Sequence, residues 1–143
     1  VLVSAGGYPK DLNLYQAQKA LDNAAHAVRP GGILILVAEC GEGFGGETFK
    51  AWMMGARSPD ELLERIQAGF VLGGHKAAAI AAVQKQVSIY LVSALPDKVV
   101  RQCGMAPHSS LETALRAAYG QLGSDASLIV MPQGGSILPF VGK

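Results

Sequence analysis

Apolar residues along this chain gather into short continuous runs that are separated by longer segments of mixed polarity. Residues 33–38 are apolar without interruption, and residues 1–3 and 89–92 form shorter runs of the same kind. Strands that are covered by helices on both faces have such sequences, because neither face meets water. The pattern therefore predicts strands at residues 1–4, 33–38, 87–93 and 127–131.

The segments between these runs repeat their apolar residues with helical spacing. Leu14, Ala17 and Leu21 begin one such stripe, which Asn13 precedes as a helix cap. Ser58 and Glu61 have the spacing of a capping box at the start of another helix. Helices are expected at residues 14–28, 47–54, 59–68, 75–86, 96–102 and 110–122.

Strands that alternate with helices predict an α/β fold. We expect residues 1–143 to form one Rossmann-like, three-layer domain with a mostly parallel sheet of four to five strands. Ligands of such sheets bind outside the carboxyl ends of the strands. The loops at that edge would be residues 4–13, 39–46, 93–96 and 131–136.

Composition narrows the classes of function. Half of the 143 residues are hydrophobic, and twelve basic residues against eleven acidic ones give a net charge of +1. Nucleic-acid binding needs a dense basic face, so it is not expected. The longest apolar run is too short to span a membrane, and Cys40 and Cys103 have no metal-ligand spacing. We therefore expect a soluble, reduced, cytoplasmic protein.

A first group of polar residues follows the first predicted strand. Gly6 and Gly7 break that strand, and Gln16 and Lys19 then lie three residues apart on one helix face. An amide and an ammonium near a helix N-terminus, which itself favours anions, would bind a carboxylate and a hydroxyl. Alternatively, Gln16 completes a capping box with Asn13, and Lys19 is an ordinary solvated charge.

A second motif follows the second predicted strand. Gly41, Gly43 and Gly46 match the G-x-G-x-x-G pattern between a strand and a helix, which is the setting of a dinucleotide fingerprint. However, the motif does not follow the first strand, and Glu39 and Glu42 would repel a pyrophosphate. Binding of an NAD-type cofactor by this loop is the alternative function.

Four further residues carry weaker signals. His75 either faces the ligand edge or lies on the surface, and His108 is expected in an exposed loop. Cys40 could be a nucleophile at the end of a strand, although no base is adjacent in the sequence. Trp52 is expected to pack within the domain or against another one.

One long motif resembles a known family. Residues 6–19 read G-G-Y-P-x-D-x-N-x-Y-Q-x-x-K, and Pro30-Gly31-Gly32 and residues 39–43 continue the likeness. This pattern is similar to the C-terminal domain of the nickel-pincer-dependent lactate racemase family. Since the chain also begins inside a strand without Met, we expect it to be the C-terminal part of a larger two-domain protein.

The resemblance implies an isomerase that racemises or epimerises lactate-type 2-hydroxy acids at a site between two domains. It implies that the N-terminal domain binds a nickel pincer nucleotide, tethers it to a lysine and supplies two acid/base histidines. The C-terminal domain would contribute Gln16 and Lys19 as catalytic and substrate-binding groups, with Tyr15 lining the cleft. The present residues alone would bind neither cofactor nor metal and would be inactive.

Overall fold

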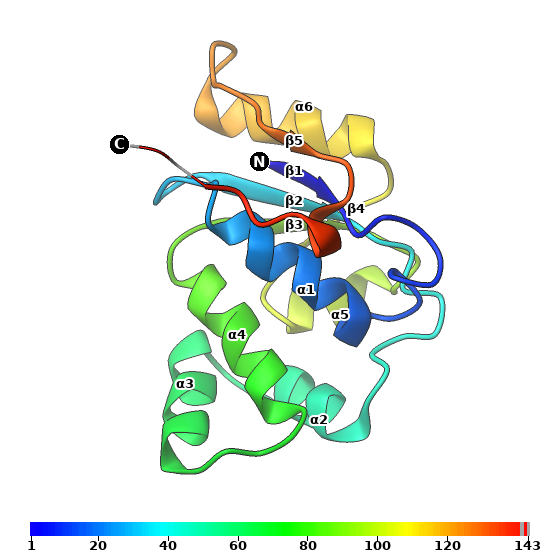
Figure 1. Cartoon of the computed structure of the whole chain (residues 1–143), viewed down its shortest axis with the longest axis vertical. Coiled ribbons are helices and arrows are strands. Elements are labelled where there is room, and N and C mark those ends of the chain that lie inside the picture. Colours follow the sequence, from blue (N-terminus) through cyan, green and yellow to red (C-terminus); the bar gives the residue numbers. More distant parts are fainter. Residues whose placement is uncertain (141, 143) are drawn as a thin grey trace.

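A computed structural model describes residues 1–140 and 142, which contain six α-helices and one five-stranded sheet (Figure 1). The strands are β1 (Leu2–Ser4), β2 (Ile33–Val37), β3 (Ser88–Val92), β4 (Ala106–His108) and β5 (Val130–Met131). The helices are α1 (Leu14–Ala25), α2 (Glu47–Gly55), α3 (Pro59–Ala68), α4 (Gly74–Gln84), α5 (Asp97–Gln102), α6 (Leu111–Leu122) and the 3-10 turn η1 (Gly134–Ser136). Within this described part, no helix combines the length and the apolar character needed to cross a membrane.

The sheet is parallel throughout, with the strand order β4-β3-β2-β1-β5. This arrangement confirms the predicted α/β class. The chain adds strands in one direction from β1 to β4 and then returns to place β5 on the other side of β1. The order therefore reverses between β1 and β5, and such a switch point is where parallel sheets form ligand crevices.

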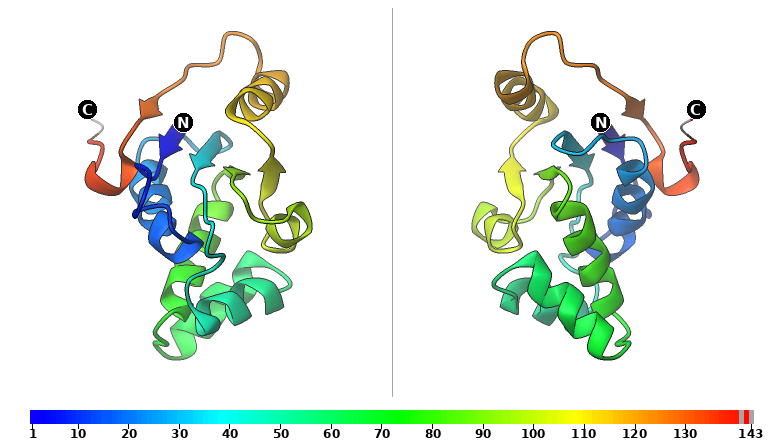
Figure 2. Two further views of the ribbon diagram at one scale, coloured as in Figure 1. Left: turned by 90° about the vertical axis from the view of Figure 1, so that its right-hand side faces the viewer. Right: turned by 90° about the vertical axis from the view of Figure 1, so that its left-hand side faces the viewer.

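The two faces of the sheet carry different helices because crossovers are right-handed. The connections from β1 to β4 all step in one direction, so right-handed crossovers place their helices on one face. The connection from β4 to β5 steps back, which places α6 on the opposite face. Figure 2 shows this arrangement, with α6 on one side of the sheet and α1 and α4 on the other.

The core is split by the sheet into two clusters. On the α1 side, Leu34 and Leu36 of β2 belong to the larger cluster, whereas Ile33 and Ile35 point toward α6. All four are buried, as the continuous apolar run predicts. Fully burying one such side chain stabilises the fold by about 1.5–3 kcal/mol.

Strand β4 was not predicted. The prediction placed His108 in an exposed loop, but the residue ends β4, is half-buried and lies with its ring 4.7 Å from that of Tyr90. The sequence did not predict this strand because Pro107 lies inside it, and a proline argues against a strand at its position. Proline is compatible with a strand at the edge of a sheet, and β4 is such an edge strand.

The helix caps follow the prediction in part. The Ser58 side chain accepts the main-chain N–H of Glu61, which is the first hydrogen bond of the predicted capping box. In the second bond of such a box, the Glu61 carboxylate would accept the Ser58 main-chain N–H; here it accepts from Arg57 and Arg65. These donors lower the pKa of Glu61. A complete capping box instead begins α6, between the side chains and main chains of Ser110 and Thr113.

Candidate functional site

The loops at the carboxyl edge of the sheet come from opposite ends of the chain. The loop after β1 leads into α1, and the segment after β5 forms η1, which packs on α1. The Lys10 ammonium donates a hydrogen bond of 2.9 Å to the Ser136 hydroxyl. Asn23 of α1 also donates through its side chain to the main-chain oxygen of Gly134 at 2.8 Å. At the switch point between β1 and β5, these hydrogen bonds therefore connect the loop after β1 and helix α1 to the segment after β5.

The N-terminus of α1 is closed by hydrogen bonds from within the chain. Leu14 and Tyr15 donate their main-chain N–H groups to the carbonyls of Gly43 and Phe44, both at 2.9 Å. Gln16 donates its main-chain N–H to Asn13 Oδ1, also at 2.9 Å. These donors are the ones that a helix normally leaves unsatisfied. The first N–H groups of α1 are therefore not free to bind an anion, and we expect an anion here to be bound by side chains.

Gln16 and Lys19 have exposed side chains in the first two turns of α1. The inward face of the same turns carries Leu14, Ala17 and Gln18, which are buried. The helical period thus turns the polar pair outward, as their three-residue spacing predicts. The sequence also allowed Gln16 to complete a capping box with Asn13. One of the two hydrogen bonds of that box is present, because the Asn13 side chain accepts the Gln16 main-chain N–H. The Gln16 side chain itself stays exposed.

Tyr15 points toward α2 and α4 and is half-buried. Its ring meets Phe49 edge-on with centroids 5.6 Å apart, and it meets His75 at 6.5 Å. The Lys76 ammonium lies 4.6 Å from the centre of the Tyr15 ring and donates to the Tyr15 main-chain oxygen at 3.2 Å. Tyr15 therefore joins the start of α1 to the starts of the two neighbouring helices.

A hollow of about 250 Å³ lies beside Tyr15. It opens where α2 and α4 begin, and the exposed Leu72 of the loop that precedes α4 forms part of its lining. Its lining comprises Tyr15, Gly45, Gly46, Glu47, Thr48, Phe49, Leu72 and Gly73. This hollow thus has mixed apolar and polar walls and borders the helix that carries Gln16 and Lys19.

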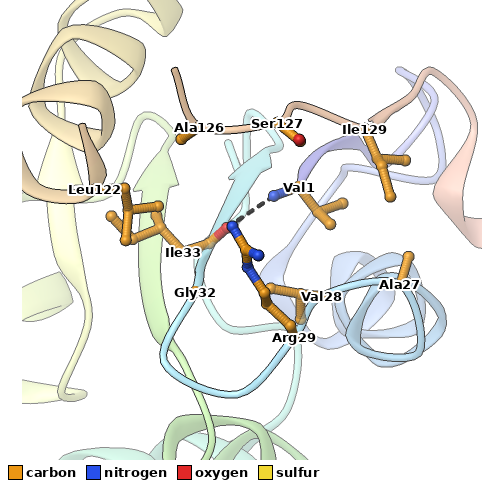
Figure 3. A pocket seen from close by; sticks show the side chains of 10 residues that line it. All are labelled: Val1, Ala27, Val28, Arg29, Gly32, Ile33, Leu122, Ala126, Ser127 and Ile129. Atoms are coloured by element: carbon orange, nitrogen blue, oxygen red, sulfur yellow. Dashed lines mark hydrogen bonds between the residues drawn. The ribbon is translucent and has the colours of Figure 1, made fainter. Parts of the chain in front are cut away.

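A second hollow of about 220 Å³ lies at the opposite edge, around the start of β1 (Figure 3). Its walls include the aliphatic side chains of Val1, Val28 and Ile129, and Arg29 supplies its charged side chain. The Val1 nitrogen donates to the Ile33 oxygen at 2.8 Å. This edge carries none of the polar groups singled out from the sequence.

The glycine motif at residues 41–46 serves the domain's own packing. Its carbonyls at Gly43 and Phe44 accept from α1, while the N–H groups of Glu42 and Gly43 donate to Leu12 and Cys40 at 2.9 Å. In a dinucleotide fingerprint, the glycines let the main chain approach the pyrophosphate. Here these four main-chain groups of the motif are paired within the domain. The geometry does not favour the NAD-type alternative.

Gly45 shows why glycine is needed in this motif. Its φ of +83° lies in the left-handed region, and a Cβ at this position would overlap with the side chain of Asn13. Asn13 in turn caps α1. The glycine therefore allows the loop to approach the cap of α1 closely.

Cys40 is held in an environment that keeps its thiol protonated. The residue is 2% exposed, has a φ of +53° and donates its N–H to the Asp11 main-chain oxygen at 2.8 Å. Burial, together with the charges of Asp11 and Glu39, raises the pKa of Cys40 to about 12. Because the thiolate is the nucleophile, this environment contradicts a nucleophilic role for Cys40. Burial likewise raises the pKa of Cys103 to about 11.

His75 and Trp52 take up structural positions near α4. His75 is half-buried, and its Nδ1 accepts the Gly73 N–H at 3.0 Å. Trp52 packs so closely on Gly74 that a Cβ there would overlap with the indole, and Arg65 lies 5.8 Å from the ring centre. Among residues 1–140 and 142, no three His, Cys, Asp or Glu side chains gather as metal ligands do.

The fold and this edge define a Rossmann-like α/β domain with one parallel sheet. The model of the family described as lactate racemase C-terminal domain matches residues 1–139. The chain belongs to that family.

Individual relatives agree with this assignment. The chain is 29% identical over 143 residues to a lactate racemase of Thermoanaerobacterium thermosaccharolyticum, covering 96% of this chain and 34% of the relative. A lactate racemase of Lactiplantibacillus plantarum is 30% identical over 134 residues, with 90% and 32% covered. The structure of the T. thermosaccharolyticum lactate racemase apoprotein superposes with a TM-score of 0.89 at 28% identity, covering 95% of this chain and 34% of that one. This chain thus spans about a third of the length of these relatives.

A pair of glycine substitutions tests the contact between the glycine motif and α1. Gly45→Ala should lower the free energy of unfolding by about 2 kcal/mol or more, since it adds both backbone strain and an overlap with Asn13. Gly120→Ala is the matched control, because it lies inside α6 where a Cβ meets open space, and it should raise stability by about 0.5–1 kcal/mol. Urea unfolding followed by circular dichroism measures both. Equal effects of the two substitutions would contradict the proposed contact.

The thiol environments predict slow alkylation. At pH 8, iodoacetamide should modify Cys40 and Cys103 at least about 100-fold more slowly in the folded chain than in urea, because burial and raised pKa values suppress the thiolate. Mass spectrometry of quenched samples follows the reaction. Rapid labelling of Cys40 in the folded chain would restore it as a candidate nucleophile.

The pairing of the glycine motif predicts that the chain does not bind NADH. Titration of NADH followed by its fluorescence should show no saturable change up to about millimolar concentration, a range in which a genuine cofactor site would be filled. Saturable binding at micromolar NADH that Gly43→Ala abolishes would revive the dinucleotide alternative.

Proposed function

We propose that this chain is the C-terminal domain of a nickel-pincer-dependent racemase or epimerase of lactate-type 2-hydroxy acids. In this proposal, Gln16 and Lys19 bind the substrate and take part in catalysis, and Tyr15 lines the cleft. The active site is shared with an N-terminal domain of the same protein. The observation that carries the proposal is the exposed amide and ammonium of Gln16 and Lys19 in the first two turns of α1. Membership of the family supports it.

Lys19 suits the charge of the substrate and of its reaction. A 2-hydroxy acid is an anion, and its hydroxyl oxygen gains carbonyl character when hydrogen leaves Cα. An ammonium can pair with the carboxylate or stabilise charge that develops on that oxygen. Because the first N–H groups of α1 are already paired within the chain, the side chain of Lys19 is the cation that this helix offers.

Gln16 complements this cation with a neutral group. Its amide has two donors and an acceptor, so it can bind the substrate's hydroxyl and carboxylate together and fix their orientation. Its position three residues before Lys19 places both groups on one face of α1. Substrate held by both side chains would be oriented relative to the helix axis.

Tyr15 would border the substrate rather than bind its charge. Its ring is held edge-on against Phe49 and faces the hollow of about 250 Å³ between the starts of α2 and α4. An aromatic wall excludes water, which strengthens the electrostatic contacts of neighbouring groups. Tyr15 would thus shape the cleft at the side of the Gln16 and Lys19 pair.

The remaining chemistry is assigned to the N-terminal domain. The described residues of this chain gather no metal-ligand cluster, so no step is assigned to a metal on this domain. When bound, the nickel pincer nucleotide would supply reversible hydride acceptance, and two histidines of the N-terminal domain would exchange the hydroxyl proton. The present domain alone is therefore proposed to be inactive, and the whole protein is proposed to be cytoplasmic.

Substitution of Lys19 tests the proposal directly. In the full-length, nickel-loaded protein, Lys19→Ala should lower kcat/KM for lactate racemisation by about 100-fold to 1000-fold, since it removes a charge that faces the substrate. Gln16→Ala should lower it by about 10-fold to 100-fold. Chiral chromatography of the product measures the rate.

Lys98→Ala is the control for these substitutions, because Lys98 is an exposed lysine on α5. The Lys98→Ala protein should racemise lactate at the rate of the unaltered protein. Unchanged kcat/KM in Lys19→Ala would remove Lys19 from the site. A full-length, nickel-loaded protein that leaves lactate unchanged would contradict the proposed reaction itself.

A further inference from the structure

Lys76 directs its side chain inward, across the gap between α4 and α1. It lies in the first turn of α4 and is half-buried. Its ammonium donates to the Tyr15 main-chain oxygen at 3.2 Å and lies 4.6 Å from the centre of the Tyr15 ring. Most lysines extend their ammonium into water. The position of this one is therefore maintained by contacts with α1.

Burial and the charge of Lys19 oppose the inward position of the Lys76 ammonium, and the contacts with Tyr15 stabilise it. Burial lowers the pKa of Lys76, and the nearby positive charge of Lys19 lowers it further, whereas Asp22 raises it. A partly desolvated ammonium is stabilised by a carbonyl acceptor and by the negative face of an aromatic ring. Tyr15 supplies both.

The carbonyl that Lys76 binds belongs to the turn that carries Gln16 and Lys19. In an α-helix, the carbonyl of one residue accepts the N–H of the residue four positions later. For Tyr15 that residue is Lys19, since both lie within α1. The Lys76 ammonium therefore donates to the same carbonyl that accepts the main-chain N–H of Lys19. This carbonyl belongs to the peptide group between Tyr15 and Gln16.

We propose that Lys76 is a positioning residue: it joins α4 to the first turn of α1 and thereby fixes Gln16 and Lys19 for the substrate. This inference rests on the proposed function for its effect on catalysis. Its structural half, that the ammonium immobilises the first turn of α1, does not depend on that function. Lys76 does not itself touch the substrate, because its ammonium is turned toward Tyr15.

Three variants of the full-length protein separate the ammonium from the rest of the side chain. Lys76→Met keeps an unbranched apolar chain but removes the charge and the donors. Lys76→Arg keeps a cation that can donate to a carbonyl and lie on an aromatic face. Lys98→Met is the matched control, because it makes the same change at an exposed lysine of α5.

The first measurement is hydrogen exchange of the apoprotein, read by mass spectrometry on peptides that cover residues 14–19. Lys76→Met should speed exchange in these peptides at least about threefold, because the turn loses the hydrogen bond and the cation–ring contact that join it to α4. Lys76→Arg and Lys98→Met should exchange like the unaltered protein. Exchange in Lys76→Met that equals the unaltered protein overturns the proposal.

The second measurement is lactate racemisation by the nickel-loaded protein. Lys76→Met should lower kcat about tenfold while KM rises less than about threefold, because misplaced groups lose more in the transition state than in binding. Lys76→Arg should recover kcat to within about threefold, and thermal midpoints should show that each variant is folded. A Lys76→Arg variant as slow as Lys76→Met overturns the positioning role.

The two measurements distinguish this inference from the proposed function. If the unaltered full-length protein does not racemise lactate, the proposed function fails, and hydrogen exchange alone decides whether Lys76 holds the turn. If Lys19→Ala is slow and Lys76→Met is as fast as the unaltered protein, the proposed function stands and the positioning role falls.

Discussion

The start of α1 depends on main-chain hydrogen bonds from a loop about thirty residues later in the chain. Gly43 and Phe44 accept the first two N–H groups of this helix, and Asn13 accepts the third. Unpaired N–H groups at a helix end would cost about 1–3 kcal/mol each if buried. This pairing holds α1 in one place on the sheet and leaves Gln16 and Lys19 as the polar groups that it presents outward.

The need to hold the start of α1 explains the role of the G-x-G-x-x-G motif at residues 41–46 in this domain. A G-x-G-x-x-G sequence after a strand provides small residues where two pieces of main chain must come close. In this domain the close partner is the capped end of α1, and Gly45 permits the approach to Asn13. The motif thus contributes to the site indirectly, by holding the helix that presents the polar pair.

Much of the fold follows from local patterns in the sequence. The run at residues 33–38 predicted β2 because a short, partly β-branched apolar run is typical of a strand buried on both faces. The three-residue spacing of Gln16 and Lys19 predicted that they share a helix face. Pro107 concealed β4, since strand propensity contains no information on edge positions. The bonding partners of the glycine motif were also not predictable, because residue types do not specify which main-chain groups are already paired.

Lys76 was missed for a related reason. In the sequence it followed the glycines and His75 at the start of an alanine-rich helix, and nothing in its neighbours indicated a contact with Tyr15, 61 residues away. A single lysine at the start of a largely apolar helix was the signal available. Such a residue has a solvated charge in most helices, so only the three-dimensional arrangement reveals its partner.

The return of the chain to place β5 beside β1 has a consequence for the order of folding. Strands β1 to β4 are joined by successive crossovers, so their contacts can form as each segment leaves the ribosome. The β1–β5 ladder and the bridge from Lys10 to Ser136 close a loop of more than a hundred residues. Closing so long a loop costs more chain entropy than closing a short one, so we expect these contacts to form late. We therefore expect the edge that carries the candidate site to be among the last parts of the domain to be completed.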